Sequence, residues 1–185
     1  MKQNLGIVGG HFFAGSLTLY TVGATVPVPI GAQQLIAEIY SLGGGFGGSG
    51  NGGGGYSKVT VPCSQLGQSV TLDFSTAQGG TCLVSQYSGG TICSAVNGNA
   101  SSYGYGNVGD IEYSGGIGDI SSGGGCAGPD GNGGHAASGV PGAGNGGYAG
   151  AGGYFTLPGN NYGGGAGSSS GSAYGGLALI VLTWH

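Results

Sequence analysis

The glycine run at residues 43–55 constrains this chain more than any other stretch. Only Phe46, Ser49 and Asn51 interrupt it. An ordered glycine gives up more backbone freedom than any other residue. The run is therefore either an unstructured linker or an element held together by dense backbone hydrogen bonding.

The rest of the sequence favours the ordered alternative. Glycine and proline together occupy nearly a third of the chain, which is typical of disorder, but hydrophobic residues still make up 38% and charged residues only 4%. Residues 177–184 form an apolar, β-forming stretch that predicts a central strand buried on both faces. A structureless loop over 97–174 would have to close before that strand could pair, and loops of this length are uncommon in compact domains. We therefore expect the glycines to be packed.

Glycine segments can pack as polyglycine II helices, which have three residues per turn and rise about 3.1 Å per residue, like polyproline II. Runs at 43–45, 52–55, 123–125 and 163–165 suit this geometry. The sequence leaves two arrangements open for the middle of the chain, a true polyglycine II bundle or a set of stacked loops.

Alternating patterns predict strands on both sides of the first glycine run. They lie at 35–40, 56–61 and 70–74, and a hairpin is predicted from 82–84 and 91–96. In the first of these strands, Leu35, Ala37 and Ile39 would share one face. We predict an all-β fold, a β-sandwich-like scaffold with glycine-rich loops and little or no helix. Residues 1–24 are predicted to form an N-terminal attachment arm, and residues 25–185 a glycine-rich β domain.

The charges exclude several function classes. The chain has two lysines, no arginine and a net charge of −4. It cannot supply the cationic surface that nucleic acids require, nor the bidentate donors of a phosphate-binding enzyme. No stretch of 18 apolar residues occurs, so membrane insertion is not expected.

Four cysteines lie at positions 63, 82, 93 and 126, with no C-x-x-C spacing. This spacing argues against zinc or a redox motif and favours buried free thiols. A disulfide would require a mature protein outside a reducing cytosol. The sequence leaves the disulfide state of Cys63, Cys82, Cys93 and Cys126 open.

Short catalytic motifs occur but lack their structural context. Residues 45–50 and 104–109 match G-x-G-x-x-G, and residues 167–171 match G-x-S-x-G. Chance matches are expected in so glycine-rich a chain, and none leads into a plausible helix. We predict no catalytic residue, no cofactor and no enzymatic activity.

The spacing of the acidic residues does not indicate a metal-binding site. Residues 130–135 favour a turn, because they lack the distal glutamate of a calcium loop. Asp110, Glu112 and Asp119 are expected to be solvated, the alternative being a shared calcium ion if their loops converge. No metal site is predicted.

Tyrosines interleaved with glycine, serine and asparagine are the strongest candidates for recognition. This combination of residue types is typical of recognition loops, because tyrosine offers a large contact area at low entropic cost. The alternative is that these rings cover the glycine core and keep water from its backbone. The candidate receptor-binding residues are Tyr103, Tyr105, Tyr113, Tyr148, Tyr154 and Tyr162.

The order of these motifs resembles the glycine-rich domain of tail-fibre and virion surface proteins of tailed phages. The resemblance covers roughly residues 20–185. The matching segments are the lead-in at 20–32, the strand at 35–40, the glycine run, the strand at 56–61, the turn at 66–68, the strand and turn at 70–80, and the closing strand at 175–184. The chain departs from the family pattern at Tyr40-Ser41-Leu42, where an aromatic followed by Gly-Ala is usual, and in having fewer long glycine runs in the middle.

The resemblance implies a β scaffold that bears glycine-rich loops or a polyglycine II bundle, on a part of the virion that meets the host surface. We expect a fibre- or spike-type virion protein that is assembled in the host cytoplasm, contacts other virion proteins, forms a homotrimer and binds a host glycan or outer-membrane protein. Two alternatives stay open. One is a capsid decoration, cement or head-fibre protein without receptor binding, and the other is a secreted polyglycine II protein that binds ice or belongs to a cell wall.

Overall fold

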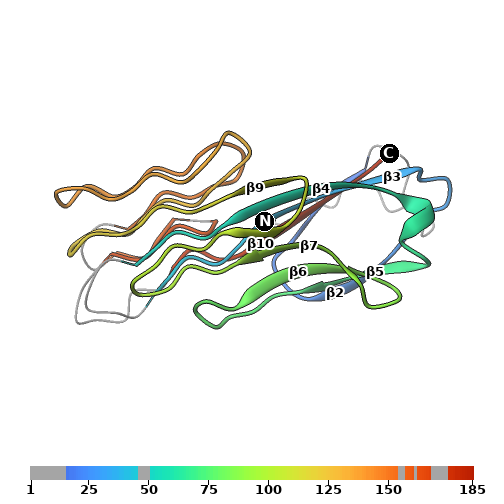
Figure 1. Cartoon of the computed structure of the whole chain (residues 1–185), viewed down its shortest axis with the longest axis horizontal. Coiled ribbons are helices and arrows are strands. Elements are labelled where there is room, and N and C mark those ends of the chain that lie inside the picture. Colours follow the sequence, from blue (N-terminus) through green and yellow to red (C-terminus); the bar gives the residue numbers. More distant parts are fainter. Residues whose placement is uncertain (1–15, 46–50, 154–156, 161, 168–174) are drawn as a thin grey trace.

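The fold is all-β, as predicted. A computed structural model describes residues 16–45, 51–153, 157–160, 162–167 and 175–185, and in it two five-stranded antiparallel sheets form a sandwich at one end of an elongated molecule (Figure 1). Extended glycine-rich segments fill the other end. Among the described residues the only helical element is the 3-10 turn Cys63–Gln65.

Strand order differs from chain order in both sheets. The first sheet contains, in spatial order, β1 (Leu17–Tyr20), β10 (Leu179–Trp184), β3 (Gln34–Tyr40), β4 (Tyr56–Pro62) and β9 (Ile111–Tyr113). The second contains β2 (Ala24–Pro27), β5 (Ser69–Asp73), β6 (Thr81–Gln86), β7 (Thr91–Val96) and β8 (Gly106–Val108).

Alternation along the strands builds the core between the sheets. Leu35, Ala37 and Ile39 of β3 are fully buried and belong to one cluster with Val70 and Val84 of the second sheet. The predicted shared face of β3 is therefore confirmed. Every second residue of a strand points to the same face of the sheet, so these three side chains lie together on the face of β3 that packs against the second sheet.

Strand β10 is an interior strand that is buried on both faces, as its continuous apolar sequence predicts. It pairs with β3 on one side and with β1 on the other, and Leu179, Ile180 and Leu182 are fully buried. The partner β1 lies within the predicted N-terminal arm. Of that arm the structure describes residues 16–24, while residues 1–15 lie outside the described part.

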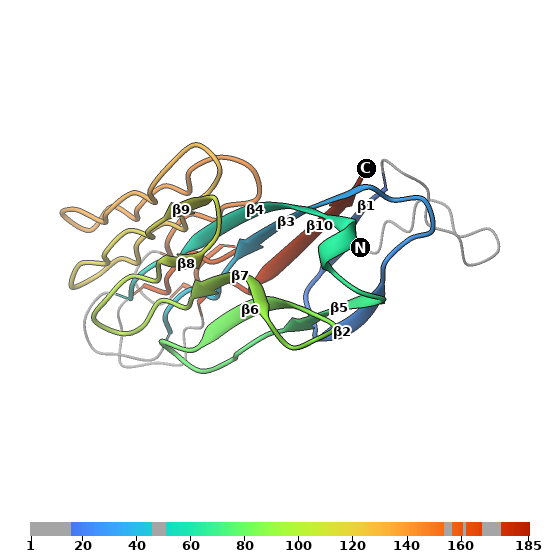
Figure 2. The ribbon, with the colours of Figure 1, turned by 45° about the vertical axis from the view of Figure 1, so that its right-hand side comes forward.

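The glycine-rich segments form what we call the glycine bundle, which consists of the segments at 42–45, 51–55, 97–99, 103–105, 114–117, 122–127, 132–136, 141–145, 149–153, 162–167 and 175–178. They are joined by long-range backbone hydrogen bonds rather than by paired ladders. Several of them are direct continuations of strands, as where β3 runs on into 42–45 and 51–55 leads into β4 (Figure 2).

The segment at 122–127 lies at the centre of the glycine bundle, and every one of its residues is buried. The N–H groups of Gly123, Gly124 and Gly125 donate to the carbonyls of Gly153, Asn51 and Gly134, each at 2.9 Å. Their own carbonyls accept from Gly142, Gly165 and Gly116. Three consecutive residues thus bond to six different segments, the threefold pattern of polyglycine II helices with three residues per turn.

Close approach explains why these positions are glycine. A Cβ atom added to Gly124 would lie 1.9 Å from the carbonyl oxygen of Gly116, and one added to Gly125 would lie 1.9 Å from that of Ala143. Any side chain would push the neighbouring backbone away and break its hydrogen bonds. The predicted packing of the glycines is therefore present in the fold.

Candidate functional site

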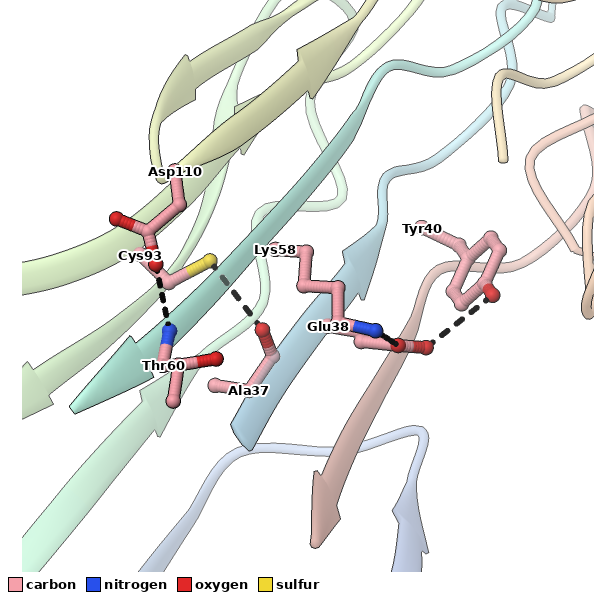
Figure 3. A network of polar contacts seen from close by, with 7 residues as sticks. All are labelled: Ala37, Glu38, Tyr40, Lys58, Thr60, Cys93 and Asp110. Carbon is pink, nitrogen blue, oxygen red and sulfur yellow. Dashed lines mark hydrogen bonds and ion pairs between the residues drawn. The ribbon is translucent and has the colours of Figure 1, made fainter. Parts of the chain in front are cut away.

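A short hairpin ties the two sheets together at one edge of the sandwich. Its first strand, β8, pairs with β7 in one sheet, and its second strand, β9, pairs with β4 in the other. At its turn the Asp110 carboxylate accepts a hydrogen bond from the Thr60 N–H at 2.9 Å (Figure 3). The bridge between Tyr105 and Ser114 extends the hairpin toward the glycine bundle.

Alternation at 103–105 places two tyrosines on the surface. Gly104 is buried, and a Cβ there would lie 2.1 Å from the Val96 carbonyl oxygen. Because residues i and i+2 of an extended segment share a face, Tyr103 and Tyr105 point away from this contact. Their exposed fractions are 39% and 47%.

These two rings and Tyr113 line an open pocket of about 400 Å³, here called the tyrosine pocket. Its lining residues are Tyr103, Tyr105, Gly106, Glu112, Tyr113 and Ser114. Its size falls within the range of small-molecule sites in proteins. The pocket combines three aromatic rings with a single carboxylate.

Four further tyrosines, Tyr40, Tyr56, Tyr148 and Tyr162, form a row on the outer face of the first sheet, and this row begins beside Tyr113 of the pocket. Tyr113 stacks on Tyr56 with ring centroids 6.4 Å apart, and Tyr56 meets Tyr40 edge-on at 5.0 Å. Tyr148 then contacts Tyr40 at 5.9 Å and Tyr162 at 6.5 Å. This tyrosine row packs with Cys126, Ala127, Leu179 and Val181, so it attaches the glycine bundle to the sheet.

The six predicted binding tyrosines therefore divide into two groups, which touch where Tyr113 stacks on Tyr56. Tyr103, Tyr105 and Tyr113 come together at the tyrosine pocket. Tyr148 and Tyr162 belong to the tyrosine row that covers the glycine bundle, although Tyr148 keeps 39% of its surface exposed. Tyr154 lies outside the described residues.

On the outer face of the first sheet, Lys58 and Glu38 form an ion pair. Lys58 Nζ lies 2.8 Å from a Glu38 carboxylate oxygen, and the Tyr40 hydroxyl donates to the other oxygen at 3.4 Å (Figure 3). Burial, together with the Glu38 charge, raises the pKa of both Tyr40 and Tyr56 well above the usual value. Both phenols are neutral at physiological pH.

All four cysteines are free and buried. Burial raises the pKa of the Cys82 thiol to about 11 and raises the pKa of Cys93 and Cys126 further still. The Cys93 thiol donates to the Ala37 carbonyl at 3.9 Å (Figure 3). Since the thiolate is the reactive form, these side chains behave as small core residues.

Asp119 and His135, two of the side chains considered as metal ligands, accept hydrogen bonds from backbone N–H groups. Asp119 accepts hydrogen bonds from the N–H groups of Ser121, Ser122 and Gly139, and these lower its pKa. His135 Nδ1 accepts from the Ile117 N–H at 2.9 Å. Within the described ranges, no group of three or more His, Cys, Asp or Glu side chains is placed to hold a metal ion.

A second pocket of about 390 Å³ lies on the glycine bundle, lined by Pro141, Gly152, Gly153, Leu157, Pro158 and Asn160. Its lining contains no aromatic or charged side chain, so it offers less for selective recognition. The described part of the chain contains no helix with the length and hydropathy of a membrane span.

Comparison with known proteins adds no relative: no protein-family model matches the chain, and no curated protein matches it. The candidate site is therefore defined by its geometry alone. Sequence reasoning considered Glu112 as a solvated acid, or alternatively as a calcium ligand, and did not consider Ser114. The available signal was the pairing of Ser114 with Tyr105, two residues beyond Glu112, which the three-residue strands β8 and β9 conceal.

Proposed function

We propose that this chain is a structural protein on the virion surface of a tailed phage, of fibre or spike type, that attaches to the host. The observation that carries the proposal is a glycine bundle that extends the sandwich as a hydrogen-bonded, side-chain-poor body. Such a body holds exposed tyrosines and loop tips at fixed positions, and a preformed surface loses little entropy on binding.

The sequence resemblance supports the phage context. The described segments that carry it are in contact with one another: the lead-in is followed by β3, residues 43–45 and 51–55 belong to the glycine bundle, and the closing strand is β10, which lies between β1 and β3. The sandwich end would face the particle, with other virion proteins as partners. A homotrimer would multiply weak contacts through effective concentration.

Binding to whole bacteria tests the proposal. Purified, fluorescently labelled full-length protein is mixed with a panel of bacterial strains, and retention on cells is measured by flow cytometry. We expect saturable retention on a subset of strains, competed by unlabelled protein. Light scattering on the same preparation should give the mass of a trimer.

Electron microscopy with antibodies separates this function from the decoration alternative. Particles that carry the protein should be labelled at the tail or at projecting fibres. Labelling spread evenly over the capsid, with no retention on any strain, would instead establish a decoration protein without a receptor.

A further inference from the structure

We propose that the tyrosine pocket binds one uncharged sugar residue of a host surface glycan. This inference rests on the proposed function, because it names the ligand class for the attachment surface. It assigns the role to the pocket formed by Tyr103, Tyr105 and Tyr113 with Glu112, and not to the tyrosine row.

The walls of the pocket suit the apolar face of a sugar ring. A phenol ring presents a flat apolar surface and a polar tip, so one residue can stack on C–H groups and also hydrogen-bond to a hydroxyl. Tyr103 and Tyr105 line the pocket, and Tyr113, which also lines it, stacks on Tyr56.

The carboxylate supplies the polar part of recognition. Glu112 lines the pocket, and an ionised carboxylate accepts hydrogen bonds through two oxygens. Two neighbouring sugar hydroxyls can donate to it together, and hydrogen bonds to a charged acceptor are stronger than those between neutral groups. The pocket therefore favours ligands with adjacent unsubstituted hydroxyls.

The charge inventory argues against anionic sugars. Arginine is absent from the whole chain, and none of the residues lining the pocket is a cation. Lys58, which neighbours β9 in the register, reaches across to β3 and is paired with Glu38 (Figure 3). A sialic acid or sugar phosphate would meet Glu112 with no compensating charge, and like charges in contact oppose binding.

An organic cation is disfavoured by the openness of the pocket. Cation–π attraction is strong where aromatic rings enclose and desolvate the cation, and weak at exposed sites. Tyr103 and Tyr105 keep 39% and 47% of their surface exposed, so they form a platform and not a cage. A sugar ring can stack on such an open platform over most of its flat face, whereas a compact ammonium group would remain largely solvated there.

The backbone beneath the pocket is held on several sides. The Gly104 N–H donates to the Gly53 carbonyl at 2.8 Å, and the Tyr105 carbonyl accepts from the Val96 N–H at 2.8 Å. The Gly115 N–H donates to the Gly104 carbonyl at 2.9 Å. The pocket is thus preformed by both the glycine bundle and the sandwich, which lowers the entropic cost of binding.

Saturation-transfer NMR on the full-length protein tests the proposal. The neutral probes are methyl glycosides of glucose, galactose, mannose and N-acetylglucosamine. The charged probes are the methyl glycoside of N-acetylneuraminic acid and choline. At least one neutral glycoside should bind with a dissociation constant on the order of 1 mM, a typical strength for a small ligand in an open site. The sialic acid glycoside and choline should bind at least about tenfold more weakly, a difference equivalent to one charged contact.

Three variants locate the binding. The double variant Tyr103→Ala/Tyr105→Ala should abolish the signal, and Glu112→Gln should weaken neutral sugar binding by about threefold to tenfold, since a charged acceptor becomes neutral. Tyr87→Ala is the matched control, because Tyr87 is 68% exposed on the β6–β7 turn and does not line the pocket. Circular dichroism and melting temperature verify that each variant is folded.

Each outcome decides the proposal. Binding of no neutral glycoside, equal binding of the sialic acid glycoside, or a preference for choline would overturn it. So would neutral binding that survives the double tyrosine substitution in folded protein. Retention on bacteria that is unaffected by that substitution would reject this pocket while leaving the attachment function intact. Sugar binding without retention on any strain would reject the attachment function and leave the pocket assignment in place.

Discussion

The two ends of the molecule are built from opposite materials. The sandwich excludes water with side chains, for example Leu35 and Trp184, which are fully buried between or against the sheets. The glycine bundle buries backbone against backbone, and its central segment at 122–127 carries only small side chains. The sandwich gains stability from apolar surface removed from water, and the glycine bundle from hydrogen bonds and close atomic contact.

This difference decides which substitutions each end tolerates. A sandwich core accepts apolar residues of similar volume, because its side chains can repack. The glycine bundle has no side chains to repack, so an added methyl group must displace a hydrogen-bonded chain. We therefore expect the bundle to be the less tolerant end toward enlargement, and the sandwich the more sensitive end toward truncation.

The largest effect should come from enlarging the centre of the glycine bundle. Gly124→Ala would place a Cβ 1.9 Å from the Gly116 carbonyl oxygen, in a segment that bonds to six neighbours. We expect it to lower the free energy of unfolding by more than about 4 kcal/mol, a loss that single substitutions rarely reach. Urea denaturation followed by circular dichroism measures it.

Gly31→Ala is the matched control for that experiment. Gly31 has a φ of +85° but no atom within 4 Å of an added Cβ. Its substitution meets only the backbone penalty of a left-handed conformation, about 1–2 kcal/mol. Equal losses for the two variants would show that the centre of the bundle is not close-packed.

Truncation in the sandwich should come next in size. Leu182 of β10 is fully buried in the core between the sheets, and Leu182→Ala should cost about 3 kcal/mol through lost transfer energy and a new cavity. Leu177→Ala, at a side chain that is 55% exposed where the bundle leads into β10, should change stability by less than about 0.5 kcal/mol. Thermal melting of both variants measures the difference. Equal losses of stability for Leu182→Ala and Leu177→Ala would contradict the expectation that the sandwich is sensitive to truncation because its core is buried.

Sequence patterns predicted the sandwich well because its signal is local. Alternation at 35–40 and the apolar stretch at 177–184 each report burial of neighbouring side chains, and both became strands of the first sheet. Strands β8 and β9 were missed because each has three residues and Gly109 and Asp110 separate them. Strand β8 pairs with β7 in one sheet and β9 pairs with β4 in the other, and no local alternation in the sequence reveals such distant partners.

The candidate site was predictable only in part, for a related reason. The alternation of Tyr103, Gly104 and Tyr105 could indicate two exposed rings on one face. The separation of the pocket tyrosines from Tyr148 and Tyr162 depends on which bundle segments are neighbours, and glycine segments carry no side-chain pattern that encodes this. Likewise, Tyr40 and Tyr56 flank the first glycine run in sequence, but only the β3–β4 register makes them a pair.

The junction between the two ends should show an intermediate effect. The buried Asn97 side chain donates to the carbonyls of Ser75 and Ala77 at 2.9 and 2.8 Å and accepts from the Leu42 N–H at 3.0 Å. Asn97→Ala leaves these backbone groups without that partner and should cost about 2 kcal/mol.

Asn145→Ala is the comparison for the junction, because the Asn145 side chain donates a single exposed hydrogen bond, to the Asn132 carbonyl. Its loss should change stability by less than about 0.5 kcal/mol. If chemical denaturation gave the two asparagine variants the same stability, the junction would not depend on the Asn97 side chain.

Acid should have the smallest effect, because the backbone-to-backbone hydrogen bonds of the glycine bundle join groups that do not titrate. Asp119 is a titratable acceptor at a loop turn: N–H groups of Gly139, Ser121 and Ser122 lower its pKa below the usual 3.8. A carboxyl group whose pKa is lower in the folded state stabilises at pH values above its unfolded pKa, and this contribution is lost as pH falls through the folded pKa. Amide NMR signals of these three residues should therefore hold steady down to about pH 4 and shift below it. Asp119→Asn should remove that shift. The amide signals of 122–127 should not change with pH in either protein, because the centre of the bundle contains no carboxylate that could be protonated. Loss of those signals at the same pH would show that the turn and the bundle unfold as one unit.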